Sequence, residues 1–219
     1  MSKKVEYIIC NAPDKPMIYV LHGGNGDMLI DTGWLSNREE IEEWLTVNKF
    51  DIKWIFLTHG HCDHSQNARY FKEKYGAKLI IHEKDIEIFK CEKFYKLYQS
   101  SDEGKFDMAQ VYRASKMTID YCEPDYSVTD DDTGLLRTLG FDADIVMLPG
   151  HTYGSMGIKC GRVIYSGDAC SAIRGDYHTA LIGCDIKMLR ESEKKVFELN
   201  PLVIAPGHGK LVINERAFG

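Results

Sequence analysis

Three histidines and one aspartate lie within six consecutive positions, from His59 to His64. They belong to residues 57–65, which read Leu-Thr-His-Gly-His-Cys-Asp-His-Ser. So many imidazoles beside a carboxylate have little use in a folded core, whereas both groups are ordinary ligands of zinc. This segment therefore predicts a metal site.

The histidine-rich segment is expected at the turn between a strand and a helix. Residues 52–57 form an apolar run short enough for a buried strand, and residues 65–75 have apolar positions at helical spacing. The first two histidines and Asp63 alternate along the extended turn, so they can converge from one side. His64 lies at the bend into the helix and can point to a second centre. One segment can thus serve two metal ions.

Three later segments repeat the order of apolar strand, glycine turn, and histidine or aspartate. They are Pro149-Gly150-His151, Ser166-Gly167-Asp168 and Pro206-Gly207-His208. Glycine lets the backbone bend tightly, which suits a sheet that presents ligands from its strand ends. Two metals that share a carboxylate need about seven protein ligands, and this chemistry suits zinc, with iron or manganese as alternatives. The candidate ligands are His59, His61, Asp63, His64, His151, Asp168 and His208.

The elements that must position these residues alternate between strands and helices. Residues 5–10, 17–21 and 28–30 predict an antiparallel meander, because turn sequences separate them. A helix is expected from about Ser36, with acidic residues in its first turn. Further strands are predicted at residues 77–81, 144–148, 156–160, 162–165 and 202–205, and a further helix at 185–199.

Residues 83–134 interrupt this rhythm and are interpreted as a helical insertion over the core. Two amphipathic helices joined by a polar loop at residues 100–105 are expected there. Their apolar positions are Cys91, Phe94, Tyr95 and Tyr98 in the first, and Met108, Val111 and Tyr112 in the second. The sequence leaves open a packed hairpin, a lid over the substrate or a dimer interface, although such stripes usually mean core.

Composition narrows the class of protein. The 219 residues suffice for one domain with a large core, and residues 1–219 are expected to form it. A net charge of −6 without a long basic run argues against a nucleic-acid partner. No apolar run has the length of a membrane span or signal peptide, and the seven cysteines form no C-x-x-C pair. We expect a cytoplasmic protein with a small-molecule substrate and no membrane partner, and leave its oligomeric state open.

The ordered set of motifs resembles the metallo-β-lactamase superfamily. Residues 59–64 match its H-x-H-x-D-H signature, and His151, Asp168 and His208 follow in the family's order. The resemblance spans nearly the whole chain. It implies an α/β fold of the αββα type, in which two packed mixed β-sheets carry helices on the outside.

By position, the resemblance implies a role for each residue. One metal would bind His59, His61 and His151, the other Asp63, His64 and His208, and Asp168 would bridge them. Asp31 matches an aspartate that orients the ligands from outside the metal shell, and Asp63 would also orient the attacking hydroxide. Tyr153 and His178 follow ligands in the sequence and are candidates for the substrate pocket.

Departures from the branches of the superfamily narrow the reaction. Zinc β-lactamases lack a bridging aspartate, so Asp168 argues against antibiotic hydrolysis, and flavodiiron proteins have glutamate in place of His61. The closest branch is similar to hydroxyacylglutathione hydrolase, also called glyoxalase II, and to the lactonases. However, acyl-homoserine lactonases have tyrosine where Ser171 stands, and too few residues follow His208 for the C-terminal domain with which glyoxalase II grips glutathione.

The sequence therefore predicts a zinc-dependent hydrolase with two zinc ions, acting on a small-molecule thioester, lactone or other carboxylic ester through a metal-bridging hydroxide. The same centre would serve a phosphodiester. A mononuclear iron enzyme resembling the persulfide dioxygenases, with His59, His151 and Asp168 as ligands, is a second alternative. A non-catalytic metal sensor is least expected, because a sensor does not need an open dinuclear site.

Overall fold

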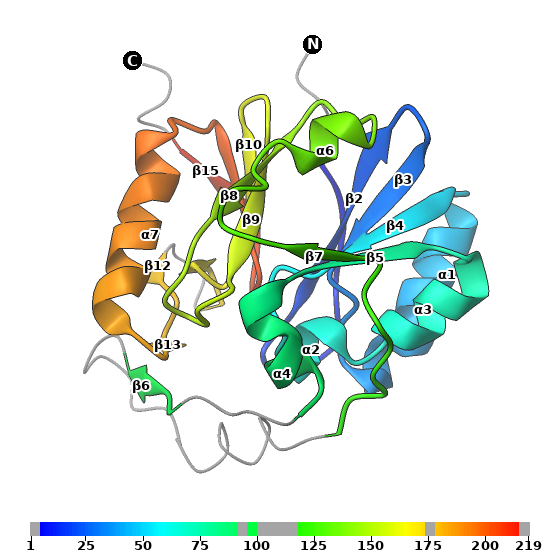
Figure 1. The fold of residues 1–219 in the computed structure, drawn as a ribbon, viewed down its shortest axis with the longest axis horizontal. Coiled ribbons are helices and arrows are strands. Elements are labelled where there is room, and N and C mark those ends of the chain that lie inside the picture. The colour runs from blue at the N-terminus through cyan, green and yellow to red at the C-terminus, as the bar shows by residue number, and fades with distance from the viewer. Residues whose placement is uncertain (1–4, 92–95, 100–117, 174–177, 215–219) are drawn as a thin grey trace.

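Two β-sheets pack face to face in the centre of the molecule, and helices cover their outer faces (Figure 1). The structure is a computed structural model, and it describes residues 5–91, 96–99, 118–173 and 178–214. The predicted αββα sandwich is confirmed. Only the parts of this sandwich that position the candidate ligands concern the function.

The first sheet joins an antiparallel meander to parallel strands. Its order within the described ranges is β1 (Glu6–Ile9), β2 (Met17–Gly23), β3 (Gly26–Ile30), β4 (Ile52–Phe56), β5 (Lys78–His82) and β7 (Tyr126–Val128). The strands β1, β2 and β3 are antiparallel, as predicted, whereas β3, β4, β5 and β7 run parallel. The histidine-rich segment follows β4, so it leaves the carboxyl end of a central strand.

The second sheet is also mixed. Its order is β15 (Val212–Ile213), β14 (Val203–Pro206), β10 (Val163–Gly167), β9 (Met156–Cys160) and β8 (Asp144–Met147). Neighbours are antiparallel except β10 and β14, which run parallel, so the residues that follow these two strands emerge at the same edge. Two short ribbons lie beyond the sheets, β11 (Cys170–Ser171) with β12 (His178–Thr179) and β6 (Tyr98–Gln99) with β13 (Ile182–Gly183).

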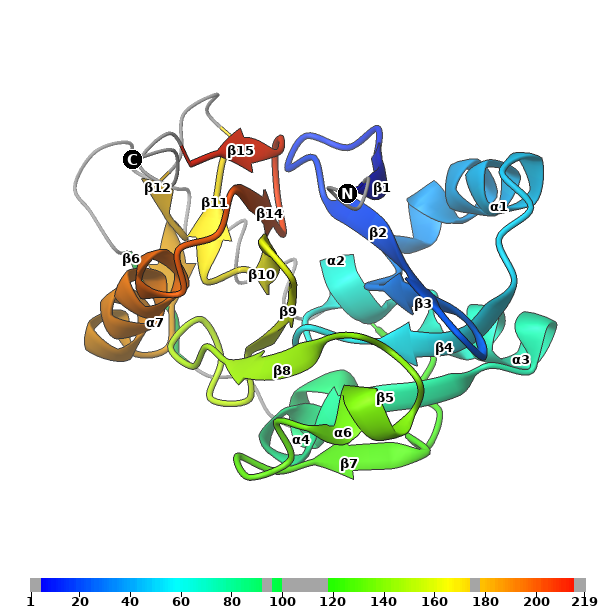
Figure 2. The same ribbon diagram turned by 90° about the horizontal axis from the view of Figure 1, so that it is seen from above.

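In the described part of the chain, three helices form the outer layers. Seen from above, α7 (Ile186–Glu198) covers the second sheet, and α1 (Arg38–Val47) and α3 (Ala68–Tyr75) cover the first (Figure 2). Shorter turns are η1 (Leu35–Asn37), α2 (Cys62–Ser65), η2 (Glu83–Asp85), α4 (Ile86–Phe89) and α6 (Leu135–Thr138). Among the described residues, none of these helices combines the length and apolar character needed to cross a bilayer.

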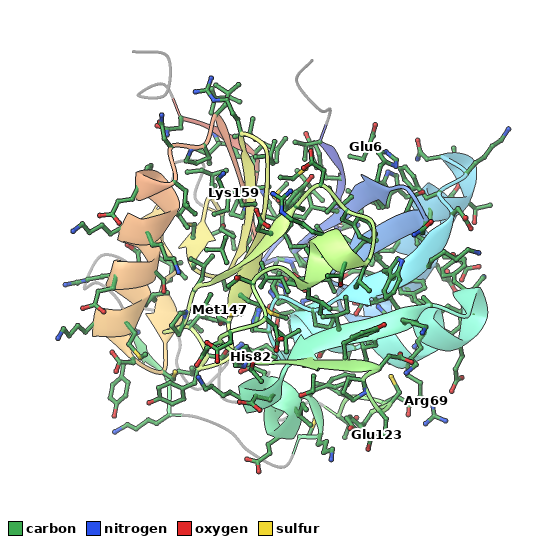
Figure 3. All side chains as sticks on the ribbon, turned by 45° about the horizontal axis from the view of Figure 1, so that its top comes forward. Glu6, Arg69, His82, Glu123, Met147 and Lys159 are labelled. Carbon is green, nitrogen blue, oxygen red and sulfur yellow. The ribbon has the colours of Figure 1, made fainter. Side chains whose placement is uncertain are left out.

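The strand β2 shows that the first sheet is apolar on both of its faces. Its alternate residues Met17 and Tyr19 face the core between the sheets, while Ile18 and Val20 face the core under α1 and α3. Successive side chains of a strand point to opposite faces, so a strand buried on both faces is apolar throughout. Charged side chains such as the labelled Arg69 and Glu123 lie on the outer surface (Figure 3).

The interval at residues 83–134 differs from the predicted helical insertion. The strand β7 lies within it and belongs to the first sheet, paired with β5. Tyr98 lies in β6, paired with β13 and 48% exposed, rather than on the apolar face of a helix. The helix α4 ends before Cys91, whose φ of 58° is left-handed, and helical spacing gives no sign of such an ending. The other positions of the two predicted helices, at 94–95 and 108–112, lie outside the described residues.

Candidate metal centre

The seven predicted ligands come together at one end of the sandwich. Four lie on the turn after β4 and on α2, which lies at the lower end of the molecule in Figure 1. The other three, His151, Asp168 and His208, follow β8, β10 and β14. Their ligand atoms form three overlapping clusters, and within each cluster the atoms lie within 4.8 Å of one another. The clusters are His59–His61–His151, His59–His64–Asp168 and Asp63–His64–His208.

The first cluster, called here the three-histidine group, consists of His59, His61 and His151. Nδ1 of His61 lies 2.9 Å from Nε2 of His151. The three rings meet edge to face, with centroids 4.7 to 4.8 Å apart. Nε2 of His59 is buried and has no hydrogen-bond partner among the described residues. An unpaired buried nitrogen is costly unless a metal completes it, so this group has the character of a ligand set.

The third cluster, called here the aspartate group, consists of Asp63, His64 and His208. Oδ2 of Asp63 lies 3.4 Å from Nε2 of His64 and 3.2 Å from Nε2 of His208. The two imidazole nitrogens are 3.3 Å apart. Atoms bound tetrahedrally at about 2.0–2.2 Å from one zinc ion lie roughly 3.3–3.6 Å from each other. The spacing of this group therefore fits a common metal.

Asp168 lies between the two groups. Its Oδ1 is 3.4 Å from Nε2 of His64, and its Oδ2 is 3.4 Å from Nε2 of His151 and 3.3 Å from that of His208. Oδ1 is buried without a hydrogen-bond partner in the described part of the chain. A β-carbon at Gly207 would overlap this oxygen, so the turn after β14 must carry glycine there. One carboxylate thus contacts both groups.

Contacts behind the rings fix which nitrogen faces the centre. Nδ1 of His151 donates to the carbonyl of Ile182 (2.9 Å), and Nδ1 of His208 donates to the carbonyl of Asp14 (2.7 Å). A carbonyl only accepts, so Nδ1 carries a proton in both rings, and Nε2 is the nitrogen that can bind a metal once it carries no proton of its own. That is the tautomer a metal requires.

Asp31 and Thr58 act in the same way behind two further rings. Oδ2 of Asp31 accepts from the Thr58 hydroxyl and from Nδ1 of His64, each at 2.8 Å. Because that hydroxyl uses its proton on Asp31, it accepts from Nδ1 of His59 (3.0 Å). Asp31 therefore lies where the sequence predicted an orienting residue, and its role in metal binding stays a prediction.

The pKa values of the cluster divide the histidines. Burial and neighbouring imidazoles lower the pKa of His59 well below its usual value and that of His61 to about 3. Burial also acts on His64 and His208, but the nearby carboxylates hold their pKa well above the usual value. Burial by itself raises the pKa of Asp63 and Asp168, yet the surrounding imidazoles keep the pKa of both carboxyl groups well below its usual range. The carboxylates therefore stay ionised.

The two candidates for the substrate pocket lie outside these groups. Tyr153 is 37% exposed and lines a hollow of about 600 Å³ together with Met147 and Met188, and none of the residues around this hollow is a candidate ligand. The backbone of His178 begins β12 and pairs with Ser171, two strands beyond Asp168. Their part in substrate binding stays a prediction.

Sequence reasoning missed several residues that support the centre. Asp85 is buried and binds the turns on either side of the three-histidine group. An acid after a predicted strand gives only a weak signal of such a role. The carbonyls of Asp14 and Ile182 are backbone atoms, so their contacts leave no signature in residue type. Thr58 stood within the motif without an assigned role.

The donor set suits a metal centre. Two buried polar atoms, Nε2 of His59 and Oδ1 of Asp168, lack hydrogen-bond partners among the described residues and belong to the clustered ligand atoms. Imidazole and carboxylate are the ligands of zinc in hydrolytic sites, and iron and manganese also accept them. A sandwich that presents such a cluster at its strand ends defines a metal-dependent class of protein.

The sequence matches the metallo-β-lactamase superfamily over residues 12–208, and the chain belongs to that superfamily. It is a metal-dependent hydrolase of the superfamily with a His/Asp metal-binding cluster, distantly homologous to the hydroxyacylglutathione hydrolases, or glyoxalase II enzymes. The hydroxyacylglutathione hydrolase GloC of Haemophilus influenzae is 30% identical over 194 residues, which cover 83% of this chain and 79% of that protein.

Two solved structures share the fold. The B3 metallo-β-lactamase BLEG-1 superposes with a TM-score of 0.69 at 22% identity, covering 96% of this chain and 94% of that one. The di-iron-bound form of TTHA1623 has a TM-score of 0.66 at 23% identity, with 94% and 93% covered. Both cover nearly all of this chain, so the likeness in fold extends over the whole sandwich.

Proposed function

We propose that the protein uses two zinc ions to hydrolyse an ester-type bond in a small molecule, which is a thioester, a lactone or another carboxylic ester. The observation that carries this proposal is the position of Asp168, which contacts His64 of the aspartate group and His151 of the three-histidine group. A carboxylate in that position suits a pair of metals better than a single one.

Each group would hold one metal, with Asp168 shared. Bound there, the ions would act as Lewis acids that lower the pKa of water from about 15.7 to roughly 7 and polarise a substrate carbonyl. The side chain of Asp63 is 17% exposed, more than the 10% of Asp168. It stays ionised beside His64 and His208, so it can accept a hydrogen bond from the attacking water and orient it. Four of the ligand rings are held from behind and are thus oriented before substrate binds; they are those of His59, His64, His151 and His208.

The choice of an ester rests on the relatives. The Haemophilus influenzae relative is named a hydroxyacylglutathione hydrolase. Hydrolysis of any carboxylic ester or thioester needs an activated water and stabilisation of the oxyanion that forms at the carbonyl. Zinc is favoured by the nitrogen-rich donor set, and the di-iron form of TTHA1623 makes iron the principal alternative. A phosphodiester is the competing substrate class.

We place the protein in the cytoplasm. The support is the cysteine pattern of the sequence, since its seven cysteines contain no C-x-x-C pair and suggest no disulfide framework. Burial also raises the pKa of Cys184 and of Cys122 to about 11, so these thiols stay protonated at neutral pH. Localisation by microscopy of the tagged protein tests this assignment, and a secreted product would contradict it.

The experiment that tests the function combines metal analysis with a substrate screen. Purified protein is analysed for transition metals, and the same preparation is assayed on thioesters, lactones and phosphodiesters. We expect close to two ions per chain and hydrolysis of at least one carboxylic ester. Turnover of phosphodiesters alone would overturn the substrate class, and a reproducible single iron would overturn the dinuclear centre.

A further inference from the structure

Asp85 is a fully buried carboxylate outside the two ligand groups. It ends η2, directly after β5, and its exposed fraction is 0%. Its Oδ2 accepts hydrogen bonds from the Gly60 N–H and from the Thr152 hydroxyl, each at 2.8 Å. Its Oδ1 accepts from the Gly154 N–H at 2.9 Å. One side chain therefore binds two turns that are far apart in the sequence.

Both turns carry members of the three-histidine group. Gly60 lies between His59 and His61, and its N–H belongs to the peptide that joins it to His59. Thr152 directly follows His151. In the structure Nδ1 of His61 lies 2.9 Å from Nε2 of His151. A shift of either turn relative to Asp85 would change the distance between His151 and the other two rings.

The aspartate group is held by other contacts. Asp31 holds Nδ1 of His64, and the Asp14 carbonyl holds that of His208. Asp63 and His64 lie within α2, whose backbone is bonded to itself and to the preceding turn. The hydrogen bonds of Asp85 therefore act on one group and not directly on the other.

Two glycines make this arrangement of Asp85 sterically possible. A β-carbon at Gly60 would lie 2.7 Å from the Asp85 carbonyl oxygen, and one at Gly154 would lie 2.5 Å from Oδ1 of Asp85. Real β-carbons do not approach that closely, so any side chain at either position would push Asp85 away. Both turns thus lack a side chain where Asp85 packs against them, with its backbone at Gly60 and its carboxylate at Gly154.

We propose that Asp85 is a positioning residue that sets the spacing of the three-histidine group and thereby its affinity for metal, while it makes no direct hydrogen bond to the aspartate group. The inference rests on the metal centre of the proposed function. Removing a residue that holds metal ligands in place without binding the metal itself typically changes metal affinity by about 10 to 100-fold. The matching loss for Asp85 should appear at one of the two metals only.

The test is a set of double variants read by metal binding. Asp85→Asn keeps the size of the side chain but turns an N–H₂ group toward a backbone N–H. It is placed in a His208→Ala chain, which keeps the three-histidine group, and in a His61→Ala chain, which keeps the aspartate group. Zinc and cobalt(II) are titrated against a chromophoric chelator, and the absorption of bound cobalt reports its coordination. We expect at least about a tenfold loss of affinity in the first chain and less than about a twofold change in the second.

Controls separate positioning from a general loss of structure. Asp125→Asn removes a carboxylate that likewise accepts a backbone N–H at 2.8 Å. The donor is Leu79, near the start of β5, whereas Asp85 follows the end of that strand. Asp125→Asn should leave both affinities unchanged. Thr152→Val removes one of the three hydrogen bonds to Asp85 and should give part of the loss, whereas Thr152→Ser keeps the hydroxyl and should restore it. The threonine pair also carries the test if Asp85→Asn fails to fold.

Each outcome decides the proposal. Equal losses in both chains, or unchanged affinity in a folded Asp85→Asn protein, would overturn it, as would a matching loss in Asp125→Asn. A wild type that binds a single metal through the three-histidine group would contradict the dinuclear function. The effect of Asp85→Asn on that metal would still test the role of Asp85.

Discussion

Oδ2 of Asp31 lies 2.8 Å from Nδ1 of His64, and Asp31 reaches it from a left-handed backbone with a φ of 62°. That conformation is unfavourable for a side chain with a β-carbon, although aspartate tolerates it better than most. Strained residues of this kind persist where the surroundings require them, commonly at functional sites. The carboxylate is also bound by the backbone N–H and the hydroxyl of Thr58. Asp31 thus joins β3 to the histidine-rich turn.

Replacing Asp31 should weaken the metal centre without unfolding the protein. Asp31→Ala leaves Nδ1 of His64 and the Thr58 hydroxyl without their acceptor, so both His64 and His59 lose their orientation. We expect a 10 to 100-fold loss of metal affinity or activity, measured by chelator competition and by turnover. Asp27→Ala is the matched control, because it breaks a similar contact of 2.8 Å to His22, on the opposite end of the same hairpin. Unchanged metal binding in a folded Asp31→Ala protein would reduce Asp31 to a turn residue.

Removing His208 separates the hydrolase from the dioxygenase alternative. In the hydrolase His208 is a ligand of the aspartate group, so His208→Ala should lose metal and at least roughly a hundredfold in activity. In a mononuclear dioxygenase that uses His59, His151 and Asp168, the variant would keep its iron. Metal analysis, hydrolysis and oxygen uptake with a persulfide are measured on wild type and variant, with the exposed His22→Ala as control. Persulfide-dependent oxygen uptake that survives in the variant would overturn the hydrolase.

The strands and the cluster could be predicted because their signals are local. Each ligand lies after a short apolar run, and His151, Asp168 and His208 each directly follow a glycine. Both the strand ends and the polar residues are therefore visible in the sequence. The alternation of Tyr19 and Val20 between two cores likewise gives an apolar strand of recognisable length. Strand ends that meet at one edge then bring distant residues together.

Other features depend on the tertiary structure and leave no local pattern. Asp85 is one of many acids in the sequence, and only the folded turns around Gly60 and Thr152 distinguish it. The short strand β7 pairs with β5 at the edge of the first sheet, although its sequence lies in an interval interpreted as a helical insertion. The left-handed Cys91 ends a helix where periodicity alone would continue it. In each case tertiary contacts outweigh local propensity.

A single methyl group at Gly207 should disable the centre. Its β-carbon would overlap Oδ1 of Asp168 and approach Cε1 of His64 within 3.1 Å, so the carboxylate must move away from the position it occupies between the two groups. Gly207→Ala should therefore lower metal content from two ions toward one and reduce activity by at least about tenfold. Gly134→Ala is the control, because nothing lies within 4 Å of its β-carbon. Two tightly bound ions in Gly207→Ala would show that Asp168 does not need its present position.

Protons should compete with metal mainly at the aspartate group. Burial lowers the pKa of His59 and His61, so these rings are neutral between about pH 5 and 8. Burial acts on His64 and His208 too, but Asp63 and Asp168 raise their pKa well above the usual value. A ring must lose its proton before it can bind a metal, so each displaced proton costs about tenfold in affinity per pH unit below its pKa. The aspartate group should therefore lose its metal first on acidification, which metal titrations of the His61→Ala and His208→Ala chains from pH 6 to 8 would measure.

In the metal-free protein the raised pKa values of His64 and His208 make the fold less stable as pH rises, whereas metal affinity increases with pH. A histidine whose folded pKa is raised stabilises the fold fully below its unfolded pKa near 6.5, and this stabilisation is lost as pH rises through the folded pKa. Asp63 and Asp168 have lowered pKa values, so their contribution is present above about 3.8 and is lost on stronger acidification. His59 and His61 act the other way, because their lowered pKa values mean that they destabilise the metal-free fold as pH falls below the unfolded value near 6.5. The unfolding free energy of the metal-free chain should thus be highest near that pH and fall on both sides of it, while stabilisation by added zinc should grow with pH. Urea unfolding with and without zinc measures both trends, and metal-free stability that rises steadily from pH 6 to 9 would contradict the raised pKa of His64 and His208.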